Sequence, residues 1–344
     1  GKGINSISYI PLAKGYVPRD ECKYDKKNYE IVSECYNALD RFIFHLKHIK
    51  ILNDIEKKIN LLDFDCLHAH SLFSNGYIAM KVNEKLEIPY IVAVRDTDLN
   101  TFFKYMFHLR STGLKILKRA SIIVFLSPSY RDSLIQKYVP IKLKESILAK
   151  SKIIPNGIDK FWLENKGVVK KIKDKKTLKL LHVGVISKRK NLNKTVEAIQ
   201  LLKEKGYNVT LTVVGKIVDK SIFNQIKDLP YVKYIDPMPK EELIKIYRDS
   251  DIFVMPSITE TFGLVYAEAM TQGLPIIYTK GEGFDGQFNE GIVGYHVNCF
   301  NSKEIADRII KIINNYERIS ENSLRLCDKF DWEKIADVYK KLYI

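Results

Sequence analysis

Residues 251–287 constrain the fold more than any other part of the chain, because short apolar strands flank a helix there. The apolar run Ile252–Met255 is typical of a strand buried on both faces of a parallel sheet. After a loop, a helix is predicted over roughly Leu264–Thr271, where a Gly and a Pro end it. A second buried strand is predicted over Ile276–Thr279. The stretch therefore predicts a strand, loop, helix and strand of a parallel α/β sheet.

Two acids flank the start of this helix. Glu260 lies in the loop, and Glu268 lies about one turn inside the helix. A helix N-terminus presents unpaired N–H groups and the positive end of a dipole, which suits an anion such as a phosphate. Gly263 lets the backbone come close to such a ligand, and carboxylates accept hydrogen bonds from sugar hydroxyls. The spacing alone equally fits an amphipathic helix with two solvated acids.

The full string from Pro256 reads P-S-x-x-E-x-F-G-L-V-x-x-E-A-M-x-x-G-x-P-I-I. It resembles the C-terminal signature of the retaining family 4 glycosyltransferases, which have the GT-B fold. The resemblance implies that Glu260 faces the donor sugar and that Glu268 binds the ribose hydroxyls of the nucleotide. It also implies that the backbone between the two acids meets the sugar and the diphosphate, at Phe262, Gly263, Leu264 and Val265.

The length of 344 residues suits two domains. Strands and helices alternate along the C-terminal part, which predicts a parallel, doubly wound sheet. With the resemblance, we expect α/β architecture of the GT-B type, with two Rossmann-like domains facing a cleft. The expected parts are an acceptor-side domain at 1–160, a linker at 161–176, a nucleotide-sugar-binding domain at 177–330, and a C-terminal helix at 331–344 that crosses back to the first domain.

The beginning of the sequence departs from the family pattern. Ile4–Ile10 is a candidate strand, but no strand–glycine loop–helix unit precedes it. Family members open with such a unit, so we expect the N-terminal domain to lack it, either because the chain is truncated or because the numbering starts late. Residues 28–60 are predicted to form a long helical stretch with a break inside.

A basic loop follows the predicted strand Leu178–Val185. Relatives read G-R-(L/I)-x-x-x-K-(G/N) here, which begins at Gly184 and aligns Lys190 with the lysine that contacts the diphosphate. Val185 stands where relatives have an Arg, so we expect Lys188 or Arg189 to supply the missing charge. Without a metal, a leaving diphosphate needs cations and oriented N–H groups. A solvated cluster of charges is the other interpretation of this turn.

Arg95 is a second departure, because relatives commonly have a His beside the donor sugar and the acceptor at this position. An Arg side chain cannot act as a base near neutral pH. It either clamps an anionic sugar, an acceptor phosphate or the leaving diphosphate, or it marks a protein that has lost catalysis.

We predict no metal and no cofactor. The pattern D-x-D, typical of metal sites in a different glycosyltransferase fold, occurs three times, at 63–65, 96–98 and 249–251, which shows how weak it is. His68 and His70 share one side of a predicted strand, where a structural or hydrogen-bonding role is favoured over metal binding. The five cysteines are scattered and form no C-x-x-C pair, which favours free thiols in a reducing cytosol.

The net charge of +15 fits an anionic partner, or merely a lysine-rich genome. No nucleic-acid motif is present, so we expect no nucleic-acid partner. The acid-free stretch Thr101–Ala120 is predicted to be a basic amphipathic helix that suits an anionic membrane surface, or equally a solvated basic face. Phe42–Lys50 also mixes apolar and basic residues, where packing within the domain is favoured over a membrane contact.

The leading hypothesis is a retaining, metal-independent glycosyltransferase of the hexosyltransferase type. The donor would be a nucleotide sugar, with UDP suggested by family frequency, and the acceptor a glycan or a lipid-linked molecule. Catalysis would involve Glu260, Lys190 and Arg95, in the cytoplasm or at the inner face of the membrane. The alternative is a catalytically impaired protein that binds nucleotide, sugar or a partner. A sugar-nucleotide epimerase shares the fold, but the string between the two acids argues against it.

Overall fold

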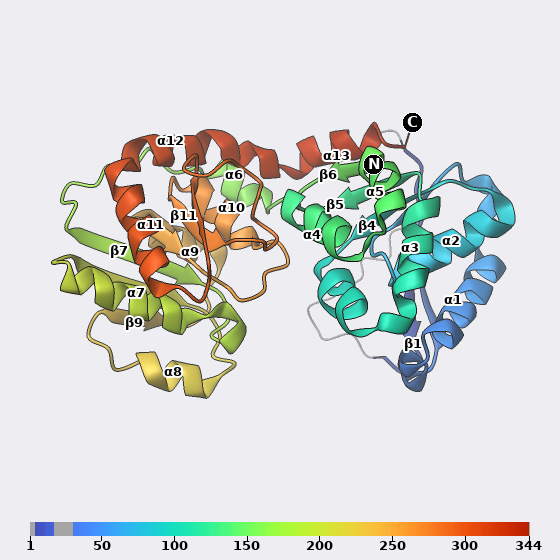
Figure 1. Ribbon diagram of the computed structural model, residues 1–344, viewed down its shortest axis with the longest axis horizontal. Helices are drawn as coiled ribbons and strands as arrows, with labels where there is room; N and C mark the ends of the chain where they lie inside the picture. The colour runs from blue at the N-terminus through green and yellow to red at the C-terminus, as the bar shows by residue number, and fades with distance from the viewer. Residues whose placement is uncertain (1–3, 17–29, 344) are drawn as a thin grey trace. The chain divides into compact units, whose positions relative to one another are not determined.

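The computed structural model describes residues 4–16 and 30–343 (Figure 1). Within these ranges the chain forms two compact units. The first unit comprises the residues up to 125 together with 135–152 and 336–343, and the second comprises 126–134 and 153–335. The domain limits expected at 160, 176 and 330 stay predictions. In the part of the chain that is described, no helix combines the length and the apolar character needed to cross a bilayer.

The first unit is built on a sheet whose strand order is β3-β4-β5-β6. Strands β3, β4 and β5 pair in parallel, and every residue of β4 is buried, as expected for a strand covered on both faces. The strands are β3 (Leu67–Ala69), β4 (Tyr90–Val94), β5 (Ile122–Phe125) and β6 (Ser151–Ile153). The main helices are α1 (Phe44–Lys58), α2 (Ser74–Leu86), α3 (Arg110–Arg119) and α5 (Ile141–Ala149), while α4 (Pro128–Tyr138) has residues in both units.

The helix predicted over 28–60 is partly wrong. Within the described residues of that range, β2 (Glu30–Tyr36) comes first and pairs in parallel with β1 (Ser8–Ala13) as a separate two-stranded sheet. A short 3-10 turn at Ala38–Phe42 then leads into α1. The β-branched and aromatic residues of β2 suit a strand, and pairing with β1 satisfies backbone groups that a helix would have satisfied internally. The absence of a first strand–loop–helix unit stays a prediction.

The single helix predicted over Thr101–Ala120 is also wrong. The segment consists of a π-helical turn at Asp98–Phe103, a 3-10 turn at Phe107–Leu109, and then α3. Aromatic packing explains the break, because Phe103 is fully buried and the rings of Phe73 and Phe102 stack 4.6 Å apart. Arg110 stabilises the bend by donating from Nε to the carbonyl of Phe103 at 2.6 Å.

Asp98, the last residue of the 96–98 D-x-D triplet, joins two loops of the first unit. Its buried carboxylate accepts the backbone N–H groups of Leu72 at 3.0 Å, Phe73 at 3.1 Å and Arg95 at 2.8 Å. Burial raises the pKa of this carboxyl, although the three N–H donors favour its charged form. Asp98 therefore ties the loop after β3 to the loop after β4.

The second unit contains a six-stranded sheet in the order β12-β11-β10-β7-β8-β9, with all neighbours parallel. This confirms the predicted doubly wound sheet. Its strands are β7 (Thr177–Val183), β8 (Asn208–Val214), β9 (Val232–Ile235), β10 (Ile252–Val254), β11 (Ile276–Thr279) and β12 (Gly294–Val297). Its main helices are α6 (Lys160–Glu164), α7 (Leu192–Glu204), α8 (Lys220–Ile226), α9 (Lys240–Asp249), α10 (Leu264–Thr271), α11 (Ser302–Asn314) and α12 (Tyr316–Leu326), and α13 (Trp332–Lys340) begins at its end.

The order of the strands creates a switch point between β7 and β10. From β7 the chain adds β8 and β9 on one side, and β10 and β11 then follow on the other side. The crossovers that follow β7 and β10 therefore leave the carboxyl edge of the sheet in opposite directions, which is the topology at which open α/β sheets bind ligands. All of β10 and residues 180–183 of β7 are buried, so the carboxyl ends of both strands are held by the apolar layers on either face of the sheet.

Replacing Asp98 with Asn tests its structural role. The amide can accept fewer of the three backbone N–H groups and places an NH₂ against some of them, so we expect a loss of about 1–3 kcal/mol in the free energy of unfolding. Urea unfolding followed by fluorescence measures it. Asp96→Asn is the matched control and should cost much less; equal midpoints for the two variants would contradict the role given to Asp98.

Candidate functional site

Two loops meet at the switch point of the second unit. The loop after β7 contains residues 184–191, and the loop after β10 contains residues 255–263. They are joined by hydrogen bonds from Ile258 N to the carbonyl of Arg189 at 2.8 Å, from Arg189 Nη1 to the carbonyl of Thr259 at 2.8 Å, and from Asn191 Nδ2 to the carbonyl of Pro256 at 3.0 Å. The structure therefore brings the basic loop and the first acid of the signature together.

Lys190 and Glu260 form a buried ion pair between these loops. Each residue is 7% exposed, and Lys190 Nζ lies 2.5 Å from Glu260 Oε2. Ser257 Oγ donates to the same oxygen at 3.3 Å, and Arg189 Nη1 lies 3.9 Å from Oε1. Burial lowers the pKa of the Lys190 amine, and the Glu260 carboxylate opposes that shift. Glu260 thus has a buried lysine as its close partner and a half-exposed arginine at the limit of ion-pair distance.

The backbone of Glu260 is held from two further segments. Its N–H donates to Glu282 Oε2 at 2.7 Å, and its carbonyl accepts from Gly283 N at 3.0 Å and from the Tyr130 hydroxyl at 2.5 Å. Sequence reasoning did not identify Glu282 or Tyr130. The position of Glu282 just beyond β11, at the same sheet edge, was a usable signal, whereas nothing in the sequence connects Tyr130 with a residue 130 positions later.

The start of α10 is shaped by Gly263. This residue has φ +79°, and a Cβ there would lie 2.4 Å from the Tyr266 ring and 3.1 Å from Glu260 Cγ. No side chain caps the helix N-terminus. Phe262 is buried among Phe284 and Phe330, whereas Leu264 is 41% exposed. The predicted helix limits agree with the structure, whereas the approach of a ligand to Gly263 stays a prediction.

Glu268 lies one turn into α10 and is partly buried. Its Oε2 accepts a hydrogen bond from the Tyr247 hydroxyl at 3.2 Å. Burial raises the pKa of this carboxyl to about 7, helped by the negative charge of Asp159 and opposed by the bond from Tyr247. Glu268 is therefore a carboxyl group that changes its charge near neutral pH.

The other predicted site residues lie in both units, Gly184 and Lys188 in the second and Arg95 in the first. Gly184 lies against Lys190, because a Cβ there would be 3.5 Å from Lys190 Cε, while Lys188 is exposed on the same loop. Val185 is 37% exposed and brings no charge. Arg95 belongs to the first unit, where its Nε donates to the carbonyl of His70 at 2.9 Å.

The two histidines of the first unit contact each other and the end of the chain. The rings of His68 and His70 lie 4.4 Å apart, and His68 Nδ1 hydrogen bonds to the Tyr343 hydroxyl. Within residues 4–16 and 30–343, no three His, Cys, Asp or Glu side chains come close enough together to hold a metal ion.

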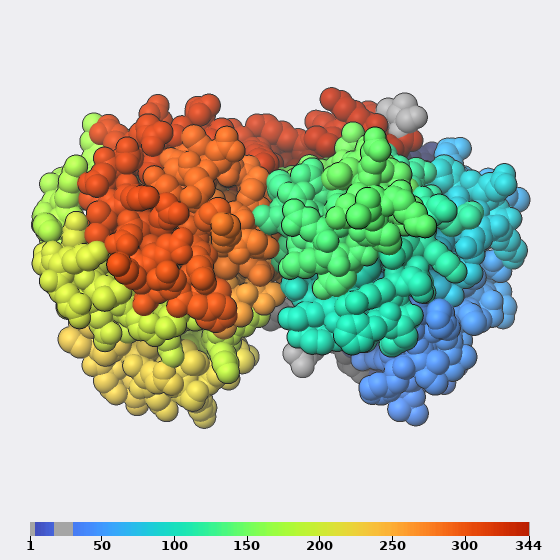
Figure 2. Space-filling view, in the orientation of Figure 1, coloured from blue at the N-terminus to red at the C-terminus, as the bar shows by residue number. Residues whose placement is uncertain are grey.

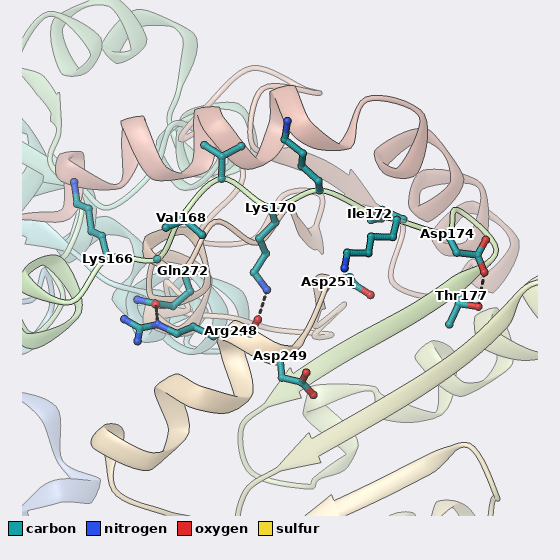
Figure 3. Close-up of a pocket in the computed structure, with 14 residues that line it drawn as sticks. Lys166, Val168, Lys170, Ile172, Asp174, Thr177, Arg248, Asp249, Asp251 and Gln272 are labelled. Atoms are coloured by element: carbon teal, nitrogen blue, oxygen red, sulfur yellow. Dashed lines mark hydrogen bonds between the residues drawn. The ribbon is translucent and has the colours of Figure 1, made fainter.

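A groove of about 830 Å³ lies at the opposite edge of the sheet (Figure 3). It is lined by the coil 166–174 and by residues near the amino ends of β7 and β10, among them Thr177 and Asp251. Lys170 points into the end of α9 and donates to the carbonyls of Arg248 at 2.6 Å and Tyr247 at 3.3 Å. A cation at a helix C-terminus is stabilising, so this lysine serves the fold rather than the switch-point site.

Two α/β units with parallel strands, one of them with paired loops at a switch point, are the architecture expected of the GT-B fold. Two family models match the chain, "Glycosyltransferase Family 4" over residues 14–160 and "Glycosyl transferases group 1" over residues 165–325. The chain belongs to this family of glycosyltransferases, enzymes of the hexosyltransferase type.

Known proteins similar to this chain agree with the assignment. An uncharacterized glycosyltransferase of Methanocaldococcus jannaschii is 25% identical, over 90% of this chain and 86% of its own length. The alpha-monoglucosyldiacylglycerol synthase of Acholeplasma laidlawii is 26% identical, over 84% of this chain and 77% of its own. The crystal structure of HepE from Anabaena in complex with UDP superposes with a TM-score of 0.68 at 16% identity, covering 98% of this chain and 99% of HepE, which confirms the predicted fold.

Gly263→Ala tests the close approach at the start of α10. Gly206 provides a matched control, because it has the same φ of +79° but no atom within 4 Å of an added Cβ. We expect Gly206→Ala to cost about 1 kcal/mol for the left-handed backbone alone. Gly263→Ala should lower the thermal midpoint clearly further, because the added Cβ also meets the Tyr266 ring. Equal losses for the two variants would show that the packing around Gly263 is looser than described.

Proposed function

We propose that this protein transfers a sugar from a nucleoside-diphosphate donor with retention of the anomeric configuration and without a metal. The observation that carries the proposal is the set formed by Lys190, Glu260 and the start of α10, at the switch point where open α/β sheets bind ligands. UDP is the proposed nucleotide, supported by the structures of HepE in complex with UDP and with UDP-glucose.

Each group has a proposed role. Lys190 and Arg189 would neutralise the diphosphate, and the N–H groups at Phe262–Val265 would meet its oxygens. Glu260 would accept hydrogen bonds from the donor sugar, and Glu268 from the ribose. Arg189 lies close enough to Glu260 to take over the charge that Val185 lacks.

The proposed chemistry is a front-face displacement. The bond from the anomeric carbon to the diphosphate oxygen breaks, and the acceptor oxygen bonds to the same face of the sugar. The acceptor proton passes to an oxygen of the leaving diphosphate, so no protein nucleophile is needed. Arg95 would clamp an anionic group of the donor or acceptor, since an arginine does not serve as a base near neutral pH.

A lipid-linked acceptor at an anionic membrane is the proposed setting, on the cytoplasmic face. Segment 38–49, blue in Figure 2, lies at the surface of the first unit. Its apolar side chains Leu39, Phe42 and Ile43 are 77%, 86% and 56% exposed, with Arg41 among them. Apolar side chains beside a cation suit a lipid headgroup region. The alternative is a glycan acceptor in solution, which the assay described next also offers.

The test is a transfer assay with UDP-, GDP- and ADP-sugars, offering glycan acceptors in solution and diacylglycerol acceptors in phosphatidylglycerol vesicles. NMR of the product should show the anomeric configuration of the donor, and the transfer rate should be the same with and without EDTA. An inverted product, or activity abolished by EDTA, would refute the proposed mechanism. Binding of a nucleoside diphosphate without any turnover would instead support the second candidate, a binding protein that has lost catalysis, which Val185 and Arg95 favour.

The raised pKa of Glu268 predicts a pH-dependent affinity for nucleotide. Ribose hydroxyls donate to the ionised carboxylate, so wild-type affinity for UDP should fall as pH drops below about 7. In Glu268→Gln this dependence is absent. The wild-type protein should bind roughly tenfold more tightly than the variant at pH 8, the worth of a charged hydrogen bond, and the ratio should approach one at pH 5.5. Calorimetry with both proteins cancels the titration of UDP itself.

The raised pKa of Glu268 also predicts how the stability of the fold changes with pH. The folded pKa lies above the unfolded value, so the ionised carboxylate destabilises the fold above pH 7, and protonation relieves the penalty as pH falls from 7 towards 4.5. Glu268→Gln should therefore have a higher thermal midpoint than wild type at pH 8, by an amount that shrinks at lower pH. A constant difference would contradict the assigned pKa.

A further inference from the structure

We propose that the ion pair between Lys190 and Glu260 discriminates the sugar nucleotide from the free nucleoside diphosphate that the reaction releases. This inference rests on the function proposed above and adds a specificity role for Glu260 that differs from simple contact with the sugar. The starting observation is that the cation assigned to the diphosphate already has a buried carboxylate as its partner, with Nζ and Oε2 2.5 Å apart.

A diphosphate and the Glu260 carboxylate compete for the same ammonium group. Lys190 is 7% exposed, and besides Glu260 its Nζ has a contact with Met255 Sδ at 3.5 Å. The guanidinium of Arg189, the second cation of the site, also lies within 3.9 Å of Glu260. An incoming diphosphate must therefore replace Glu260 at one or both cations. The free energy of breaking that buried pair is subtracted from the binding of every ligand that carries a diphosphate.

The exchange has to come from movement of the lysine. The backbone of Glu260 is fixed by Glu282, Gly283 and Tyr130, and Ser257 donates to the carboxylate, so this side chain has little freedom to withdraw. Lys190 is a flexible four-carbon chain at the end of a short 3-10 turn. Swinging its ammonium towards a diphosphate leaves the Glu260 carboxylate buried without its cation.

What replaces the lysine at Glu260 then differs between the two ligands. A sugar nucleotide brings hydroxyl groups that donate to the carboxylate, so the buried charge is satisfied again. A free nucleoside diphosphate brings no such donor, and an unpaired buried charge is costly. The pair therefore weakens binding of the product more than binding of the donor, which favours product release after transfer.

The test compares UDP binding by calorimetry for wild type, Glu260→Gln and the control Glu268→Gln. Glutamine still accepts from Ser257 and Lys190, so the fold is expected to persist, and thermal unfolding verifies it. Glu260→Gln should bind UDP about fivefold or more tightly than wild type, a typical coupling between interacting groups. Uridine, which carries no phosphate, should gain nothing, and Glu268→Gln should not tighten UDP binding.

Two further measurements separate the freed lysine from a general loosening of the site. The double variant Lys190→Met, Glu260→Gln removes both charges and should bind UDP more weakly than wild type; tighter binding by it would overturn the proposal. The ratio of the Kd for UDP to the Kd for UDP-glucose should fall in Glu260→Gln. Unchanged or weaker UDP binding by Glu260→Gln, with wild type binding normally, refutes this inference alone. If wild type binds none of UDP, GDP and ADP, the proposed function fails as well.

Discussion

The parallel pairing of β7 with β10 is the constraint on which the second unit depends. The two strands are neighbours in the sheet but are separated along the chain by β8, β9 and the helices between them. Their carboxyl ends therefore deliver two loops of unrelated sequence to one place. One loop brings lysine and arginine, the other brings a carboxylate and the start of a helix, and cross-loop hydrogen bonds hold them together.

Electrostatics at this place follow from burial as much as from charge. Lys190 and Glu260 are both buried, so each charge requires the other as its counter-ion. Lys188 on the same turn is exposed, and water solvates its charge. Glu268 is close by in sequence but meets a tyrosine hydroxyl instead of a cation, so burial governs its protonation. These four charged groups thus have three different environments: a buried ion pair, an exposed surface position and a carboxyl group beside a tyrosine hydroxyl.

Much of the second unit was predictable, because its strands are continuous apolar runs and its helices have clear stops. Helix α10 and strand β11 have the predicted limits. The errors lie where tertiary packing decides. Glu30–Tyr36 becomes a strand only through β1, and the stretch before α3 breaks where Phe102 and Phe103 both pack against Phe73. At the candidate site, the sequence identified the two acids and the basic turn but not Tyr130. Tyr130 contacts Glu260, which lies 130 positions later, and no sequence pattern links the two residues.

The loop that follows β11 has little freedom to change its length. Glu282 and Gly283 form hydrogen bonds with the main chain of Glu260. Gly283 also packs so closely that a Cβ on it would lie 2.0 Å from the carbonyl oxygen of Thr261. Two residues later, Asp285 is anchored to Ser129 and His296. An insertion or deletion between these anchors would displace Glu260 even though Glu260 lies about twenty positions away in sequence. Variation among relatives that keep this acid should therefore be by substitution here, with gaps confined to loops on the far edge of the sheet.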